Sequence, residues 1–171
     1  MNLQLLLENE LVKIRPLSPQ DLQPLYEIAK DPKIWEQHPC KRNVRREFEK
    51  FFQESIESNG ALTILDKKSG DIIGSSRFKS VEGVPNGVEI GYTFIGRKYW
   101  GGNYNRAVKD LMIEHAFKFV DNVLFYVAKE NIRSQKAVKK IGGRKVSESD
   151  TKVFPKKGAE NEKFIITQEY K

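Results

Sequence analysis

Cysteine is almost absent from this chain of 171 residues, and Cys40 is the only one. An internal disulfide is therefore excluded, and with His38 and His115 as the only histidines a structural zinc site is not expected. No apolar run approaches the roughly 20 residues that span a bilayer, and the N-terminus lacks the basic segment and apolar core of a secretion signal. We therefore predict a cytoplasmic protein that binds no metal and no membrane.

Low-complexity tracts and internal repeats are absent as well. Apolar residues make up 39% of the chain and charged residues 31%, a balance typical of folded proteins and not of disordered ones. A chain of this length can bury roughly two thirds of its unfolded surface in one core, and it leaves no room for two. The sequence therefore predicts a single domain over residues 1–171.

The net charge of +7 bears on partners and solubility, not on the fold. Nucleic acid, an acidic surface or a polyanionic cofactor would each suit this charge. The basic residues occur as scattered pairs, however, and no aromatic-studded strand of the RNA-recognition type accompanies them. Charge alone thus does not select nucleic acid as a partner.

Apolar spacing predicts an alternation of strands and helices. Strands are expected at 11–15, 61–65, 72–78, 88–95, 122–127, 144–147 and 162–170, and helices at 18–31, 44–58, 104–119 and 132–140. The segment 34–42 is either a loop or a short helix. The strand at 122–127 is strongly apolar, which is consistent with a buried parallel partner of 88–95. The fold class is α/β of the α+β kind.

The stretch from 88 to 119 organises the chain, because a strand passes there through a turn rich in glycine and asparagine into a long helix. Gly101 and Gly102 permit backbone conformations closed to other residues, and asparagine is the next most tolerant of a left-handed conformation. N–H groups at a helix start attract phosphate, and Arg97 and Lys98 stand at the entrance. The alternative is that any strand-to-helix turn needs glycine. Neither the P-loop pattern nor the Rossmann fingerprint is present.

Five short motifs, together with this order of elements, resemble the GNAT superfamily of acyl-CoA-dependent N-acetyltransferases, and within it the branch of ribosomal-protein N-terminal acetyltransferases. The motifs are Ile14-Arg15-Pro16-Leu17, Asp31-Pro32, Glu89-Ile90-Gly91-Tyr92, Tyr99-Trp100-Gly101 and Asn131-Ile132-Arg133-Ser134. The resemblance covers nearly the whole chain. It implies one acyl-CoA-binding domain, with a mixed, mostly antiparallel sheet of about seven strands flanked by about four helices. It also implies a V-shaped splay between the strands near 88–95 and 122–127.

In that family the diphosphate of acetyl-CoA, the expected co-substrate, lies on the loop that opens the central helix. The resemblance implies that the pantetheine arm pairs with a strand edge. The cofactor-binding residues would be Thr93, Phe94, Ile95, Arg97, Trp100, Gly101, Gly102, Asn103, Tyr104, Asn105, Asn131 and Ser134. The chain departs from the usual loop pattern at Trp100, Asn103 and Asn105, and Gly143 stands where the family often has phenylalanine after the fourth helix.

Two residues are candidates for the chemistry. Only a neutral amine can attack, and at pH 7 roughly a tenth of an α-amine is neutral but far less of a lysine. Glu89, an isolated acid in the central strand, could serve as a base through water, or it could be an outward-facing or structurally paired carboxylate. By resemblance Ser134 could give a proton to the departing sulfur; otherwise it is an exposed helix serine. Other branches use a tyrosine where Val138 stands.

The leading hypothesis is an N-acetyltransferase that moves acetyl from acetyl-CoA to a primary amine, of a protein N-terminus or a small molecule, by direct attack in a ternary complex. A non-catalytic acyl-CoA-binding or regulatory module with the same fold is the alternative, and a basic nucleic-acid-binding protein is a third. The acceptor would be recognised by residues 35–42, 81–87 and 149–161, the least patterned parts of the chain. A homodimer stays open.

Overall fold

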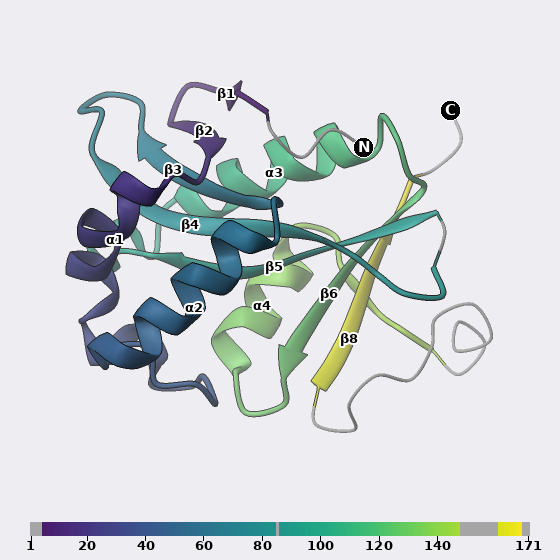
Figure 1. Ribbon diagram of the computed structural model, residues 1–171. Coiled ribbons are helices and arrows are strands. Elements are labelled where there is room, and N and C mark those ends of the chain that lie inside the picture. The colour runs from purple at the N-terminus through teal and green to yellow at the C-terminus, as the bar shows by residue number, and fades with distance from the viewer. Residues whose placement is uncertain (1–4, 85, 148–160, 169–171) are drawn as a thin grey trace.

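The computed structural model describes residues 5–84, 86–147 and 161–168, and these form one sheet in the order β1-β2-β3-β4-β5-β6-β8-β7 (Figure 1). All neighbouring strands are antiparallel except β5 and β6. The strands are β1 (Leu7–Glu8), β2 (Val12–Pro16), β3 (Ala61–Asp66), β4 (Ile72–Ser80), β5 (Gly87–Ile95), β6 (Asn122–Ala128), β7 (Arg144–Lys145) and β8 (Asn161–Thr167). The mixed, mostly antiparallel sheet is confirmed. The expected seven strands become eight, because the two-residue β1 carries no alternating pattern.

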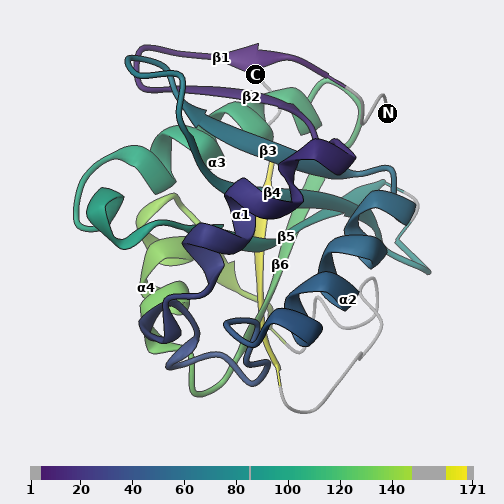
Figure 2. The same ribbon diagram turned by 60° about the vertical axis from the view of Figure 1, so that its left-hand side comes forward.

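The four helices are α1 (Leu22–Ala29), α2 (Arg45–Glu57), α3 (Tyr104–Ala116) and α4 (Ile132–Lys140). In Figures 1 and 2, α1 and α2 cover one face of the sheet, and α3 and α4 lie on the other. Short 3-10 turns precede three of them: η1 (Pro19–Asp21), η2 (Pro32–Trp35) and η3 (Arg97–Tyr99). Of the segment 34–42, only the start is helical. No helix within the described ranges is both long and apolar enough to cross a membrane.

Each face of the sheet has its own apolar core. Aliphatic and aromatic side chains fill the α3 side, among them Ile14, Ile64, Phe78, Met112 and Phe125. Aromatic rings dominate the α1 and α2 side, among them Trp35, Phe48, Phe51, Phe52 and Phe94. Since full burial of such a side chain is worth about 1.5–3 kcal/mol, the two clusters hold the helices to the sheet. Any site reaching from one face to the other must pass between strands.

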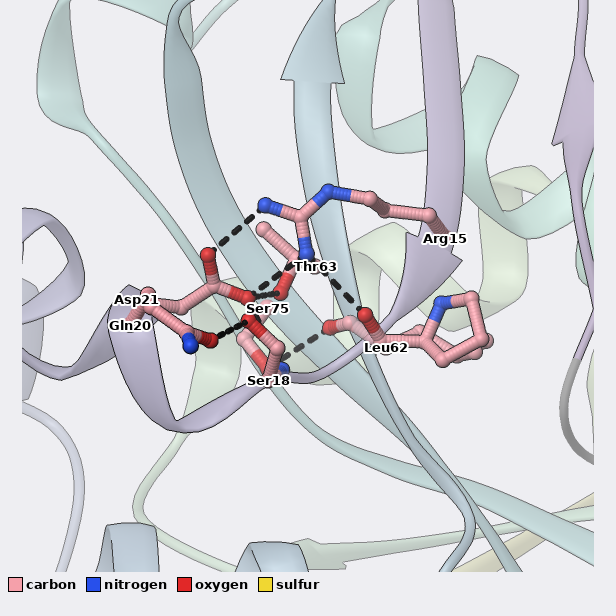
Figure 3. Close-up of polar contacts among 8 residues, drawn as sticks. Arg15, Ser18, Gln20, Asp21, Leu62, Thr63 and Ser75 are labelled. Atoms are coloured by element: carbon pink, nitrogen blue, oxygen red, sulfur yellow. Dashed lines mark hydrogen bonds and ion pairs between the residues drawn. The ribbon is translucent and has the colours of Figure 1, made fainter.

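An ion pair with a buried carboxylate fixes the start of α1 (Figure 3). The Asp21 carboxylate accepts two hydrogen bonds from Arg15, each at 2.7 Å, one from the Thr63 hydroxyl at 2.7 Å and one from the Ser18 N–H at 3.0 Å. Burial of Asp21 opposes its ionisation, but these donors together lower its pKa. The Ile14-Arg15-Pro16-Leu17 motif therefore has a structural role, because Arg15 ties β2 to the turn before α1.

Gly74 is a position where the sheet tolerates no side chain. It pairs with Ile95, and a Cβ atom added there would lie 2.1 Å from the Phe94 carbonyl oxygen. Backbone oxygen cannot yield as a side-chain tip can. We expect Gly74→Ala to lower the free energy of unfolding by about 2–3 kcal/mol, measured by urea denaturation. Gly102→Ala is the control, since a Cβ there meets nothing within 4 Å; equal stabilities of the two variants would contradict the expectation.

Candidate active site

β5 and β6 separate after a short parallel contact. Only three pairs join them, the last being Glu89 with Leu124, although both strands continue. The cause lies in β5, where one extra residue between the pairs of Arg77 with Gly91 and of Ser75 with Phe94 makes a bulge. Tyr92 takes a left-handed conformation there, with φ of 57°. The V-shaped splay is confirmed, and Figure 1 shows the two strands diverging from their shared end.

The loop before α3 leaves its backbone donors uncapped. Asn103 is the N-cap and its side chain makes no capping bond, while the Ala107 N–H donates to the Asn103 carbonyl at 2.8 Å. The N–H groups of the turn before Ala107 have no acceptor within the helix. Such donors and the helix dipole together favour an anion. The start of α3 is thus suited to a phosphate.

The asparagines of this loop do not play the conformational role expected of them. Gly101 has φ of 76°, but Asn103 is right-handed, with φ of −91° and ψ of −1°. Only glycine therefore takes the left-handed conformation among residues 96–105. The replacement of the family's usual glycine by Asn103 carries no left-handed strain.

Side chains near the loop are mostly engaged elsewhere. The Trp100 indole N–H donates to the Ile95 carbonyl at 2.8 Å, and the Arg133 guanidinium lies 4.1 Å from the Trp100 ring. The Tyr104 hydroxyl donates to Asp66 at 2.9 Å. Arg97 pairs with Asp31 and lines a groove of about 740 Å³ beside α1. Contact of Arg97 with a phosphate stays a prediction, as does the role of Phe94 in the strand edge.

Glu89 lies at the vertex of the splay. Its carboxylate folds over Gly91, since a Cβ added to Gly91 would lie 2.8 Å from Oε1. On the neighbouring strand β6, burial and then the charge of Glu89 raise the pKa of Tyr126, whose buried hydroxyl has no partner in the part of the chain described. The carboxylate thus sits where the two strands part. A catalytic role for Glu89 stays a prediction.

At the start of α4, Asn131 is the N-cap, as predicted. Its side-chain oxygen accepts the Ser134 N–H at 3.1 Å, and the residue is only 6% exposed. The amide nitrogen of Asn131 remains able to donate. Ser134 is half-buried in the first turn of α4, which directly follows β6. Its role as a proton donor is likewise a prediction.

A buried lysine, missed by the sequence analysis, faces the splay from α3. Lys109 is 6% exposed, and its ammonium donates to the Thr93 hydroxyl at 2.6 Å. Thr93 in turn lies 2.8 Å from the Ser76 hydroxyl. Burial lowers the pKa of Lys109 to about 7, although the charge of Glu89 opposes this. The sequence did carry a signal for the burial of this lysine, since Lys109 stands in the buried stripe of α3 between Val108 and Met112.

The described segments expected to recognise the acceptor belong to different apolar clusters. Residues 35–42 fold against the aromatic core, with the Trp35 indole donating to the Ala29 carbonyl at 2.7 Å. Burial and then Arg42 lower the pKa of His38 to about 4, so this ring is neutral at pH 7. Val81 and Val84 pack against β6 and β8. Most of 149–161 lies outside the described residues.

Throughout residues 5–84, 86–147 and 161–168, no group of three or more histidine, cysteine or acidic residues could hold a metal ion. The splay and the loop before α3 offer backbone donors, the Glu89 carboxylate and hydroxyl groups. These suit a phosphate-bearing thioester and an amine better than a cation.

The chain matches one protein-family model and many solved structures. The model for the acetyltransferase (GNAT) domain matches residues 12–144. A GCN5-related N-acetyltransferase from Brucella melitensis has a TM-score of 0.79 at 17% identity, with 96% of this chain and 79% of that chain covered.

Two structures from Vibrio cholerae also match. A proposed ribosomal-protein-serine acetyltransferase has a TM-score of 0.78 at 13% identity over 98% of this chain and 100% of that chain. A spermidine N-acetyltransferase, solved with CoA and spermine, has a TM-score of 0.67 at 16% identity over 94% and 97%. No curated protein sequence matches the chain.

Proposed function

Because this chain belongs to the GNAT acetyltransferase family and is an acetyl-CoA-dependent N-acetyltransferase, we propose that its acceptor is a primary amine that attacks the thioester directly in a ternary complex. The observation that carries this proposal is the splay of β5 and β6 beside the uncapped start of α3. A thioester between the strands can be reached from both faces of the sheet. Membership of the family supports catalysis over a non-catalytic module.

Acetyl-CoA supplies an activated acetyl group and a thiolate leaving group. The N–H groups of residues 101–106 would hold its diphosphate, with Gly101 giving the turn its left-handed step. The edge of β5 over residues 93–95 and the Asn131 amide would bind the pantetheine amides. The residues at the loop and at the splay therefore fit the co-substrate.

The chain's own acid and base complete the proposed reaction. Glu89 would take a proton from the amine through water, since its carboxylate lies over Gly91 at the point where the strands part. The new bond joins nitrogen to the acetyl carbon, and the carbon–sulfur bond breaks. Ser134 would give a proton to the departing sulfur from the first turn of α4 and would regain one from solvent water, which restores its hydroxyl.

The two similar structures from Vibrio cholerae suggest two kinds of acceptor. One is of a proposed ribosomal-protein-serine acetyltransferase, and the other is of a spermidine N-acetyltransferase with spermine bound. A protein N-terminus and a polyamine both bear amines, so either would satisfy the proposed chemistry. Basic side chains of β4 lie near Glu89, and a polycation such as a polyamine would have to approach them. This charge repulsion weighs against a polyamine as the acceptor.

A charge placed in the loop before α3 tests the proposed phosphate site. Gly101→Asp forces a side chain into a left-handed conformation and sets a carboxylate among the phosphate donors, so we expect CoA to bind about 30-fold or more weakly by calorimetry. Gly142→Asp is the matched control. Gly142 is also left-handed, with φ of 92° and no atom within 4 Å of an added Cβ, but it follows α4. Equal CoA affinities of the two variants would refute the phosphate site.

A further inference from the structure

Arg77 is a buried cation with unsatisfied hydrogen-bonding capacity. It lies on β4 and is 6% exposed. Its guanidinium donates to the Ser55 hydroxyl and lies 4.2 Å from the centroid of the Tyr92 ring and 5.5 Å from that of Phe51. The Nε atom is buried and has no hydrogen-bond partner in the described structure. A donor of this kind is rarely left unsatisfied in a folded protein.

A second arginine also lies against the ring of Phe51. The half-buried Arg42, from the segment before α2, lies 4.0 Å from the centroid of Phe51 and 5.5 Å from that of Trp35. Burial lowers the pKa of both guanidinium groups, and for Arg42 the charge of Arg77 lowers it further. The two cations have a common neighbour, the Phe51 ring, at 4.0 Å for Arg42 and 5.5 Å for Arg77.

No carboxylate of the described residues forms an ion pair with either arginine. Glu54 and Glu89 are the acids whose charges act on Arg77, while Lys79 adds a further cation, its ammonium 3.2 Å from the Tyr92 hydroxyl. Elsewhere this protein pairs a half-buried arginine with a buried carboxylate, as Arg15 does with Asp21. Aromatic faces offset only part of the desolvation of a guanidinium. Among the described residues, the two arginines thus have no anionic partner, and an anion of a ligand could supply one.

The position of the two arginines connects them with the acceptor. Arg77 pairs across the sheet with Gly91, over which the Glu89 carboxylate lies. Arg77 donates to Ser55 of α2, so its side chain lies on the face covered by α1 and α2, and the alternation along β5 places Glu89 on the same face. Helix α3 and its phosphate loop lie on the other face (Figures 1 and 2). Positions two residues apart on one strand face are roughly 7 Å apart. An anion at Arg77 and an amine at Glu89 could belong to one small molecule.

Resting on the proposed acetylation of an amine, we propose that Arg42 and Arg77 bind an acidic group of the acceptor. The acceptor is then a small amino acid-like molecule, with its amine at Glu89 and a carboxylate between the two guanidinium groups. Guanidinium is the side chain best suited to a carboxylate or phosphate, because its paired donors match two oxygens. The aromatic walls of Phe51, Tyr92 and Trp35 would contact the apolar part of the molecule.

Matched acceptors test this subsite through thiol release from acetyl-CoA. L-phenylalanine is compared with its amide, which keeps the α-amine and loses the negative charge, and phosphoethanolamine with ethanolamine. We expect kcat/KM to favour an acidic member about tenfold or more, and Arg42→Gln to remove that preference. Arg45→Gln is the control, since Arg45 contacts Glu49 and Gln23 on the surface. The phenylalanine pair tests for recognition of a carboxylate, and the ethanolamine pair tests for recognition of a phosphate.

A binding measurement separates this inference from the proposed reaction. Calorimetry with the CoA-loaded enzyme and the product N-acetyl-L-phenylalanine needs no catalysis, and we expect Arg42→Gln or Arg77→Met to weaken binding about tenfold or more. Turnover of neutral amines at rates equal to the acidic ones, unchanged by Arg42→Gln, would overturn the acidic subsite and leave the amine acetylation standing. No turnover of any amine would count against the proposed function. The subsite would then be decided by the calorimetry alone, with unchanged or absent binding refuting it.

Discussion

Glu89→Gln is expected to lower kcat by about 100-fold or more at pH 7 while CoA binds as before, because glutamine keeps the shape of the side chain and loses the proton acceptor. The amide can still fold over Gly91, where a Cβ would lie 2.8 Å from the present oxygen. Thiol release measures kcat, and calorimetry with CoA reports whether the site is intact. Loss of both together would indicate a structural role for the carboxylate.

The pH dependence of this variant separates base catalysis from other effects. An acceptor amine is increasingly neutral as the pH approaches its own pKa, about 8 for an α-amine, so the need for a base falls. The deficit of Glu89→Gln should therefore shrink between pH 7 and pH 9. Glu114→Gln, an exposed change on α3, is the control and should match the wild type. A deficit that is constant with pH would argue against proton removal by Glu89.

Periodic segments could be predicted from the sequence because their patterns reflect burial. α4 occupies Ile132–Lys140 as expected, and the apolar β6 is the parallel partner of β5. β1 could not be found, since two residues that pair with Ile14 and Lys13 carry no period. The bulge at Tyr92 was also invisible, because tyrosine is not a residue that signals a left-handed backbone. That bulge nevertheless separates β5 from β6.

The candidate site was predictable where it depends on backbone, and less so where it depends on charge. Glycine and asparagine marked the start of α3, and Asn131 marked the cap of α4. Arg77 and Lys109 were missed, because a lysine or arginine within a pattern is normally a solvated position. Both are instead 6% exposed. Their burial depends on tertiary contacts with Tyr92 and Thr93 that no local spacing encodes.

Lys109→Met is expected to stabilise the protein by about 3 kcal/mol at pH 6. Burial lowers the pKa of Lys109 from 10.5 to about 7, so the folded state disfavours the charged form by up to ~5 kcal/mol below pH 7. Loss of the hydrogen bond to Thr93 lowers the free energy of unfolding of the variant by about 1–2 kcal/mol, which offsets part of this gain. Thr93 keeps its contact with the Ser76 hydroxyl at 2.8 Å. Methionine matches the length of the lysine stem and packs against Phe125. Urea denaturation measures the gain.

The sign of the pH dependence follows from the lowered pKa. Between about pH 7 and 10.5 the unfolded state binds more protons at this residue than the folded state, so the stability of the wild type rises with pH across that window. The advantage of Lys109→Met should be largest below pH 7 and should be lost before the pH reaches 10.5, because the penalty on the charged lysine disappears while the variant still lacks the hydrogen bond to Thr93. Lys118→Met, a change at an exposed lysine just after α3, should leave both the stability and its pH dependence nearly unchanged. A destabilised Lys109→Met variant would mean that the ammonium is held by compensating contacts stronger than its loss of solvation, and would contradict the lowered pKa.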